Sequence, residues 1–340
     1  MVLAEGKGVG VTVRFLIAAA VAAAMIAAPP PARADIALIL SGVPGSPEHE
    51  TRFAEWSAAT RDALTGEFGF AEEDVVLLEN REARADDVRA AFADIGGRIG
   101  ENETFFLFFI GHGAFDRGDY KFNIMGADLT AADYASMLDN LPAARTAIIN
   151  GTSSSGASIE PLAAANRVIV TATRTGNERL DPLFYEYFLE TLSAEAADED
   201  RNERLSIWEV FRYTTLEIER FYEEQGRLAT EHSQLSDNGG EQAGIERERE
   251  AVLARLINFN QVVPANIEDP VLAALYEERQ ALEAAVAELR LVEDVLPTSE
   301  FNDQLDELLI NLALKNQEIR EREAAGTEAD TEDTGPEVQP

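Results

Sequence analysis

The 340-residue chain contains no cysteine, only three histidines, and 28 basic residues against 63 acidic ones, for a net charge of −35. Without cysteine, the fold has no disulfide, no thiolate nucleophile and no thiolate metal ligand. A surface this acidic repels nucleic acid and anionic lipid head groups, because both bind through basic side chains. We therefore expect no nucleic-acid partner. The charge suits divalent cations, basic partners or simply solubility.

Apolar runs long enough to span a bilayer are also missing. Residues 15–28 form an apolar stretch shorter than the roughly 20 residues that a spanning helix needs. Lys7 and Arg14 precede it, and Ala32-Arg33-Ala34 offers a small-x-small cleavage site after it. We predict that residues 1–34 are a signal peptide, with an uncleaved anchor as the alternative. The mature protein would then be periplasmic or extracellular, with no stable membrane insertion.

What is present is an alternation of buried-strand and amphipathic-helix patterns, which predicts an α/β domain over residues 35–240 with a mostly parallel sheet flanked by helices. The expected strands are residues 36–40, 74–78, 104–112, 146–149 and 167–173. The expected helices are residues 51–68, 85–99, 130–138, 182–193 and 205–228, the third capped by Thr130. The segment after His112, with Asp116, Asp119 and Tyr120, reads as a polar loop.

The C-terminal part has a different composition. Residues 241–325 are mostly helix formers, with leucines recurring every seven residues in two arms separated by Pro297. This pattern predicts an antiparallel, coiled-coil-like helical hairpin that packs on itself or on the α/β domain. Residues 326–340 are acidic and are expected to be disordered. The sequence does not fix an oligomeric state.

Two of the expected strands deliver polar residues to one edge of the sheet. The third ends in His112-Gly113, and the fourth is followed by Thr152-Ser153-Ser154-Ser155-Gly156. Open α/β sheets bind ligands at the carboxyl ends of their strands, and a histidine and a hydroxyl can serve there as base and nucleophile. The pairing resembles the legumain-type family of the caspase–legumain clan of cysteine peptidases. In that family one strand ends in His-Gly and the next in Ala-Cys-x-Ser-Gly.

The resemblance implies a caspase-like fold with His112 as the base and the Gly113 N–H as part of the oxyanion hole. It also places Ser153 where the family has its nucleophilic cysteine. A serine hydroxyl is far less acidic than a thiol and normally needs a histidine in direct hydrogen-bond contact. We therefore expect a catalytically impaired peptidase homologue that binds peptides or proteins. The alternatives are an active hydrolase that uses Ser153, or Thr152 or Ser154, with His112, and a scaffold that works through its helical hairpin.

Further polar residues accompany this pair. Arg174, Asn177 and Glu178 follow the fifth strand, where the family shapes its specificity pocket, and are expected to bind substrate; Arg174 could pair with an acidic side chain of the substrate or with Glu178. Asp116 and Glu178 are the nearest candidates for an acid that orients His112. The remaining histidines, His49 and His232, lie in polar segments without a zinc-binding spacing.

Residues 198–209 follow the spacing of an EF-hand calcium loop. The expected oxygen ligands, at positions 1, 3, 5, 7, 9 and 12, are Asp198, Asp200, Asn202, the carbonyl of Arg204, Ser206 and Glu209. Position 6, normally glycine, is Glu203, which should weaken the site. The alternative is an acidic helix start in which Ser206 and Glu209 form a capping box.

Overall fold

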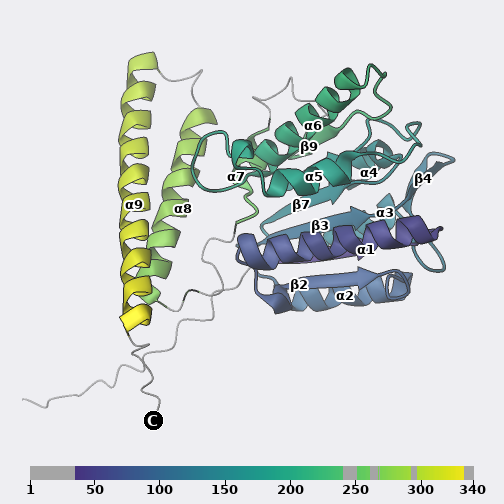
Figure 1. Cartoon of the computed structure of the whole chain (residues 1–340), viewed down its shortest axis with the longest axis horizontal. Helices are drawn as coiled ribbons and strands as arrows, with labels where there is room; N and C mark the ends of the chain where they lie inside the picture. The colour runs from purple at the N-terminus through teal and green to yellow at the C-terminus, as the bar shows by residue number, and fades with distance from the viewer. Residues whose placement is uncertain (1–34, 240–250, 261–266, 268, 292–296, 333–340) are drawn as a thin grey trace, which may run out of the picture. The chain divides into compact units, whose positions relative to one another are not determined.

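A computed structural model describes residues 35–239, 251–260, 267, 269–291 and 297–332 of the chain (Figure 1). Its main element is a six-stranded sheet with the order β2-β1-β3-β7-β8-β9. The first five of these strands pair in parallel, and β9 pairs antiparallel with β8. The strands are β1 (Ile36–Ser41), β2 (Val75–Glu79), β3 (Thr104–Ile110), β7 (Arg145–Asn150), β8 (Arg167–Thr171) and β9 (Gln234–Asp237).

Helices cover both faces of this sheet, and the alternation of side chains along each strand divides the core in two. Phe106 and Phe108 of β3 belong to one apolar cluster, and Phe105, Leu107 and Phe109 belong to the other. Since both faces are covered, all seven residues of β3 are buried, which explains its continuous apolar run. The predicted fold class, a mostly parallel sheet flanked by helices with a C-terminal helical region, is confirmed.

The helices of the α/β part begin and end close to the predicted bounds. They are α1 (Pro47–Asp62), α2 (Ala85–Arg98), α3 (Ala131–Leu138), the short α4 (Ile159–Leu162), α5 (Phe184–Leu192) and α6 (Ile207–Glu224). Thr130 caps α3 as expected, in a capping box with Asp133. The first helix starts at Pro47, four residues before its expected start, because Ser46 caps it and Pro47 fits its first turn. Its last part, Ala63–Glu67, is a π-helix.

The prediction of a polar loop after His112 is wrong. This segment forms a second, three-stranded sheet of β4 (Gly113–Asp116), β5 (Asp119–Phe122) and β6 (Leu129–Thr130). Arg117 and Gly118, both with positive φ, make the two-residue turn between β4 and β5. Tyr120 and Phe122 of β5 are buried, so the hairpin packs its apolar side chains inward and shows its polar ones.

The C-terminal region contains α7 (Val252–Leu256), α8 (Pro270–Leu291) and α9 (Thr298–Glu332). The two long helices pack against each other, with Leu272, Tyr276 and Ile319 in a small apolar cluster (Figure 1). The expectation of disorder from residue 326 is corrected in part, since α9 continues to Glu332 although Gly326 and Thr327 are weak helix formers. The signal-peptide prediction (1–34) and residues 333–340 lie outside the described residues. Among the helices that the structure describes, none is both long and apolar enough to cross a membrane.

Candidate functional site

His112 stands at the carboxyl edge of the large sheet, directly after β3, and both of its ring nitrogens face a polar partner. Nε2 lies 3.1 Å from the carbonyl oxygen of Pro44, which follows β1, and Nδ1 lies 3.4 Å from a carboxylate oxygen of Asp181. A carbonyl can only accept, so the Nε2 proton points at Pro44. In a neutral ring the basic nitrogen is therefore Nδ1, on the side of Asp181.

Asp181 was not identified from the sequence. Its second oxygen lies 2.7 Å from Nε2 of His49, whose Nδ1 is 2.9 Å from the Ser46 hydroxyl. The two imidazoles meet edge to face at 4.6 Å, and Phe53 packs against both. One carboxylate thus joins two of the three histidines of the chain. The acids proposed from the sequence lie elsewhere: Asp116 is exposed at the end of β4, and Glu178 pairs with His232 at 2.9 Å.

Ser153 reaches the same edge from the end of β7, but its hydroxyl does not meet the imidazole. It donates to the carbonyl oxygen of Gly113 at 3.0 Å. Gly113 approaches this loop so closely that a Cβ there would lie 2.2 Å from the Ser153 carbonyl oxygen. Within the described residues, no hydrogen bond joins Ser153 to His112. The site therefore contains the expected residues without the contact between nucleophile and base.

A buried polar network fixes the loop that carries Ser153. The Thr152 hydroxyl lies 2.7 Å from the Tyr120 hydroxyl and donates to Asn150 Oδ1 at 2.8 Å. Burial raises the pKa of Tyr120 to about 12, so this phenol stays protonated and can act as a donor. Ser154 is buried with a left-handed φ of 59°. Neither Thr152 nor Ser154 presents a hydroxyl at the surface, so the alternative registers for a nucleophile gain no support.

The segment expected to bind substrate lies beside the Ser153 loop, since the Ser154 amide donates to the Glu178 carbonyl oxygen at 2.8 Å. Phe115 of β4 packs on Gly176, where a Cβ would lie 2.3 Å from its ring. Arg174 and Asn177 are exposed, and in the described ranges the Arg174 guanidinium forms no ion pair. Glu178 is held internally: its carboxylate accepts from the Arg174 and His232 amides. Arg174 and Asn177 thus remain free for a ligand, and Glu178 acts as a cross-link.

Close to this segment, Glu231 anchors the start of α5. Its two oxygens accept the N–H groups of Leu183 and Phe184 at 2.8 and 3.1 Å, and it also accepts the Tyr222 hydroxyl. Burial raises the pKa of this carboxyl from 4.5 to about 7, against the opposing effect of these hydrogen bonds. The Glu231 carboxyl therefore gains or loses its proton near pH 7.

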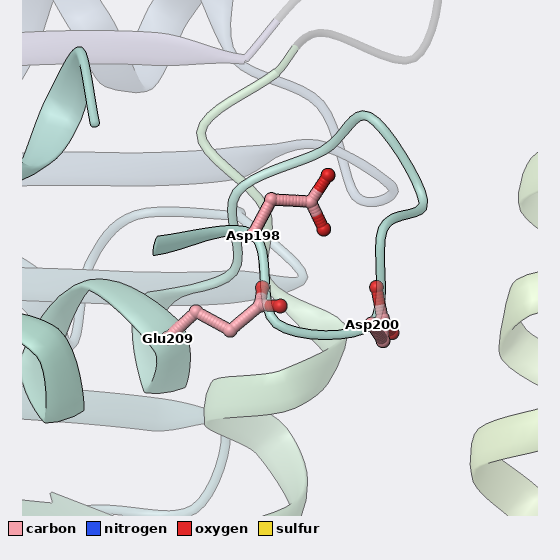
Figure 2. A group of neighbouring side chains, drawn as sticks. All are labelled: Asp198, Asp200 and Glu209. Atoms are coloured by element: carbon pink, nitrogen blue, oxygen red, sulfur yellow. The ribbon is translucent and has the colours of Figure 1, made fainter. Parts of the chain in front are cut away.

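The loop at 198–209 brings three of its predicted ligands together (Figure 2). Asp198, Asp200 and Glu209 each offer a carboxylate oxygen, and these oxygens lie within 4.8 Å of one another. Glu209 extends from the first turn of α6, and burial followed by the charge of Asp198 raises its pKa against its hydrogen bonds to Ser206. A hard divalent cation is the kind of ligand that such a cluster of oxygens suits.

The other predicted ligands serve the loop itself. Asn202 Oδ1 accepts the Arg204 amide at 2.8 Å. The Ser206 hydroxyl donates to Glu209 at 2.6 Å, and the two residues form the capping box that was the alternative interpretation. Glu203 at position 6 has a φ of 64°, the left-handed conformation that the motif normally gives to glycine. Capping box and converging carboxylates thus coexist in one loop.

Comparisons with known proteins identify no family for this chain. No family model matches it, and no curated protein matches it. Among solved structures, it is similar to the Drosophila initiator caspase Dronc, at 14% identity and a TM-score of 0.42, over 60% of this chain and 80% of that one. It is also similar to protein GSU0716 from Geobacter sulfurreducens, at 15% identity and a TM-score of 0.41, over 62% of this chain and 93% of that one. Likenesses this distant carry no conclusion about activity.

Proposed function

We propose that the chain is a legumain-type, caspase-like peptidase homologue that binds an extended peptide or a protein partner at the carboxyl edge of its sheet and does not cleave it. The observation that carries the proposal is the hydroxyl of Ser153, which donates to the Gly113 carbonyl instead of to His112. A serine without a base in hydrogen-bond contact is a poor nucleophile.

The ring nitrogens of His112 also face partners other than Ser153. Nε2 of His112 is taken up by Pro44, and Nδ1 faces Asp181. A proton leaving Ser153 has no acceptor in hydrogen-bond contact except a backbone carbonyl, which is a very weak base. What remains at the edge is a set of groups suited to recognition: the half-buried imidazole, the free Arg174 guanidinium, which can pair with an acidic side chain, and the amide of Asn177.

Two further elements belong to this proposal. Residues 1–34 direct export as a signal peptide, so that the mature protein works in the periplasm or outside the cell. The 198–209 loop binds calcium weakly, which the converging carboxylates of Asp198, Asp200 and Glu209 support.

The test is hydrolysis of a fluorogenic peptide library by protein expressed from the full chain, beside Ser153→Cys, His112→Ala and the double variant. We expect no turnover by the unmodified protein. Cleavage should appear in Ser153→Cys, because a thiolate needs less help from the base, and disappear in the double variant. Thermal melts of all four proteins would separate loss of chemistry from loss of folding.

Turnover by the unmodified protein that is lost in His112→Ala would contradict the proposal and assign a serine hydrolase. If no variant cleaves, fluorescence anisotropy with labelled library peptides distinguishes a binding site from an inert edge. Binding that weakens in Arg174→Ala supports recognition at this edge. Absence of any binding would contradict the proposed binding function.

A further inference from the structure

The α9 helix carries large apolar side chains on two sides, and those on one side are exposed. On one side, Phe301 and Ile319 are buried, the latter in the cluster shared with α8. On the other side, Ile310 and Leu314 are 61% and 54% exposed. They are four residues apart, so they lie on the same face of the helix. Single exposed leucines are ordinary, whereas neighbouring large apolar side chains on a surface helix mark a contact surface.

Uncompensated negative charge borders this exposed face. Asp306 and Asp303 lie one and two turns before Ile310 on the same side of the helix, and Glu307 lies at its margin. Within the described ranges none of the three has an ion-pair partner. The basic residues of α9 are already engaged. Lys315 pairs with Glu278 and Glu318 at 2.6 Å each, Arg320 pairs with Glu203, and Arg322 pairs with Asp269.

From these observations, we propose that the outer face of α9, formed by Ile310 and Leu314 with Asp303, Asp306 and Glu307, is a docking surface for a basic amphipathic helix of another protein. The partner would place apolar residues spaced by three or four on Ile310 and Leu314, and lysines or arginines opposite the carboxylates. This surface is separate from the sheet edge proposed above, and it does not depend on that proposal.

Charge decides between the possible occupants. A second copy of the chain would bring the same carboxylates against this face, and each copy carries a net charge of −35. Like charges placed opposite each other oppose docking, and they do so equally for anionic membranes and nucleic acids. A cationic helix gains from both the apolar patch and its border.

The probe is a fluorescein-labelled synthetic helix of leucine and lysine in amphipathic order, and its binding to the full-length protein is followed by anisotropy at low and high salt. A peptide of the same composition, scrambled so that no apolar face forms, is the control. We expect the ordered peptide to bind more tightly than the scrambled one. Ile310→Ser/Leu314→Ser should weaken binding roughly tenfold or more, whereas Leu228→Ser, which removes a 91% exposed leucine elsewhere, should not change it.

The charged border is tested separately. Asp303→Asn/Asp306→Asn/Glu307→Gln should weaken binding and flatten its salt dependence. The matched triple change on α6, Glu219→Gln/Glu223→Gln/Glu224→Gln, removes the same charge from exposed positions and should have little effect. Equal losses in both triple variants, or no loss in Ile310→Ser/Leu314→Ser, would overturn the proposal, because attraction would then be non-specific. Self-association in sedimentation that vanishes in Ile310→Ser/Leu314→Ser would also overturn it and assign the face to a second copy.

Discussion

The sheet edge and the 198–209 loop gather polar groups in opposite ways. At the edge, partners come from segments far apart in the chain, as with His49 and Asp181, which are separated by 132 residues. In the loop, twelve consecutive residues supply every group, and backbone turns within the loop orient them. Residues Thr152–Ser155 at the edge are buried and tightly packed, whereas Asp200 in the loop is exposed. Changes at the edge should therefore disturb the fold, and changes in the loop should disturb mainly the affinity for a cation.

The largest effect is expected from Glu231, which is buried beside the edge. Its pKa is raised from 4.5 to about 7 by burial, so the folded state holds the proton more tightly than the unfolded state. The free energy of unfolding should therefore fall as pH rises from about 4.5 to about 7, by up to about 3 kcal/mol from this group. Urea unfolding of the unmodified protein and of Glu231→Gln across this range should give a difference that changes with pH by that amount.

A matched control is Asp35→Asn, since Asp35 is half-buried and desolvation raises the pKa of its carboxyl to about 6. It should remove a separate part of the pH dependence, ending at a lower pH than the part due to Glu231. If the free energy of unfolding changes with pH in the same way for Glu231→Gln and the unmodified protein, the expectation is contradicted. The contrast between the buried residues beside the edge and the exposed loop would then be weaker.

Gly113→Ala should cost about 2 kcal/mol of unfolding free energy. The added Cβ would lie 2.2 Å from the Ser153 carbonyl and 2.5 Å from the Thr152 hydroxyl oxygen, both held by their own hydrogen bonds. Gly97→Ala is the control: it lies in α2 with open space around it and should stabilise by roughly 0.5–1 kcal/mol. Urea denaturation measures both, and equal effects would mean that the edge is not tightly packed.

Calcium should raise the stability of the protein through the loop alone. With a dissociation constant on the order of 10⁻⁴ to 10⁻³ M, the range of weak extracellular sites, the gain is about 1.4 kcal/mol when Ca²⁺ is ten times that constant. Calorimetric titration and thermal melts of the unmodified protein and of Asp198→Ala measure it. Asp116→Ala, which removes an exposed acid at the other end of the α/β part, is the control. Identical titrations for all three proteins would remove the calcium prediction.

The smallest effect is expected from Glu203→Gly. Residue 203 has a φ of 64°, so glycine should relieve about 1 kcal/mol of backbone cost in the folded state and raise the free energy of unfolding in urea by about that amount. Glu203→Ala removes the same side chain, including its exposed pair with Arg320, without the backbone freedom, and should not raise it. A gain in both variants would attribute the effect to the side chain and not to the turn.

The parallel strands could be predicted from the sequence because each is a continuous apolar run buried on both faces. β3 ends two residues before its expected end at His112, and β7 falls within one residue of its expected bounds. β9 was missed because its four residues, Gln234–Asp237, include a single apolar side chain, and antiparallel pairing at the end of a sheet imposes no apolar run. The β4–β5 hairpin had a local signal in Arg117-Gly118, which was read as a loop.

The candidate site could also be predicted only in part from the sequence. The positions of His112 and Ser153 follow from strand ends alone, but the direction of their hydrogen bonds depends on loops after β1 and β8. Pro44 and Asp181 lie 68 and 69 positions away from His112 along the chain, and no spacing in the sequence brings them together. In the 198–209 loop, three of the six predicted ligands, Asp198, Asp200 and Glu209, do come close together, because they belong to one contiguous segment with its own backbone turns. Calcium binding by this loop stays a prediction.

The short strands at the two ends of the large sheet have a consequence for the behaviour of the protein at high concentration. β2 has five residues and β9 has four, against seven in the central β3. Short outer strands offer few unpaired backbone groups to a neighbouring molecule, and so they discourage the addition of strands from other copies, the first step towards aggregates. Together with a net charge of −35, this arrangement should keep crowded copies of the protein dispersed.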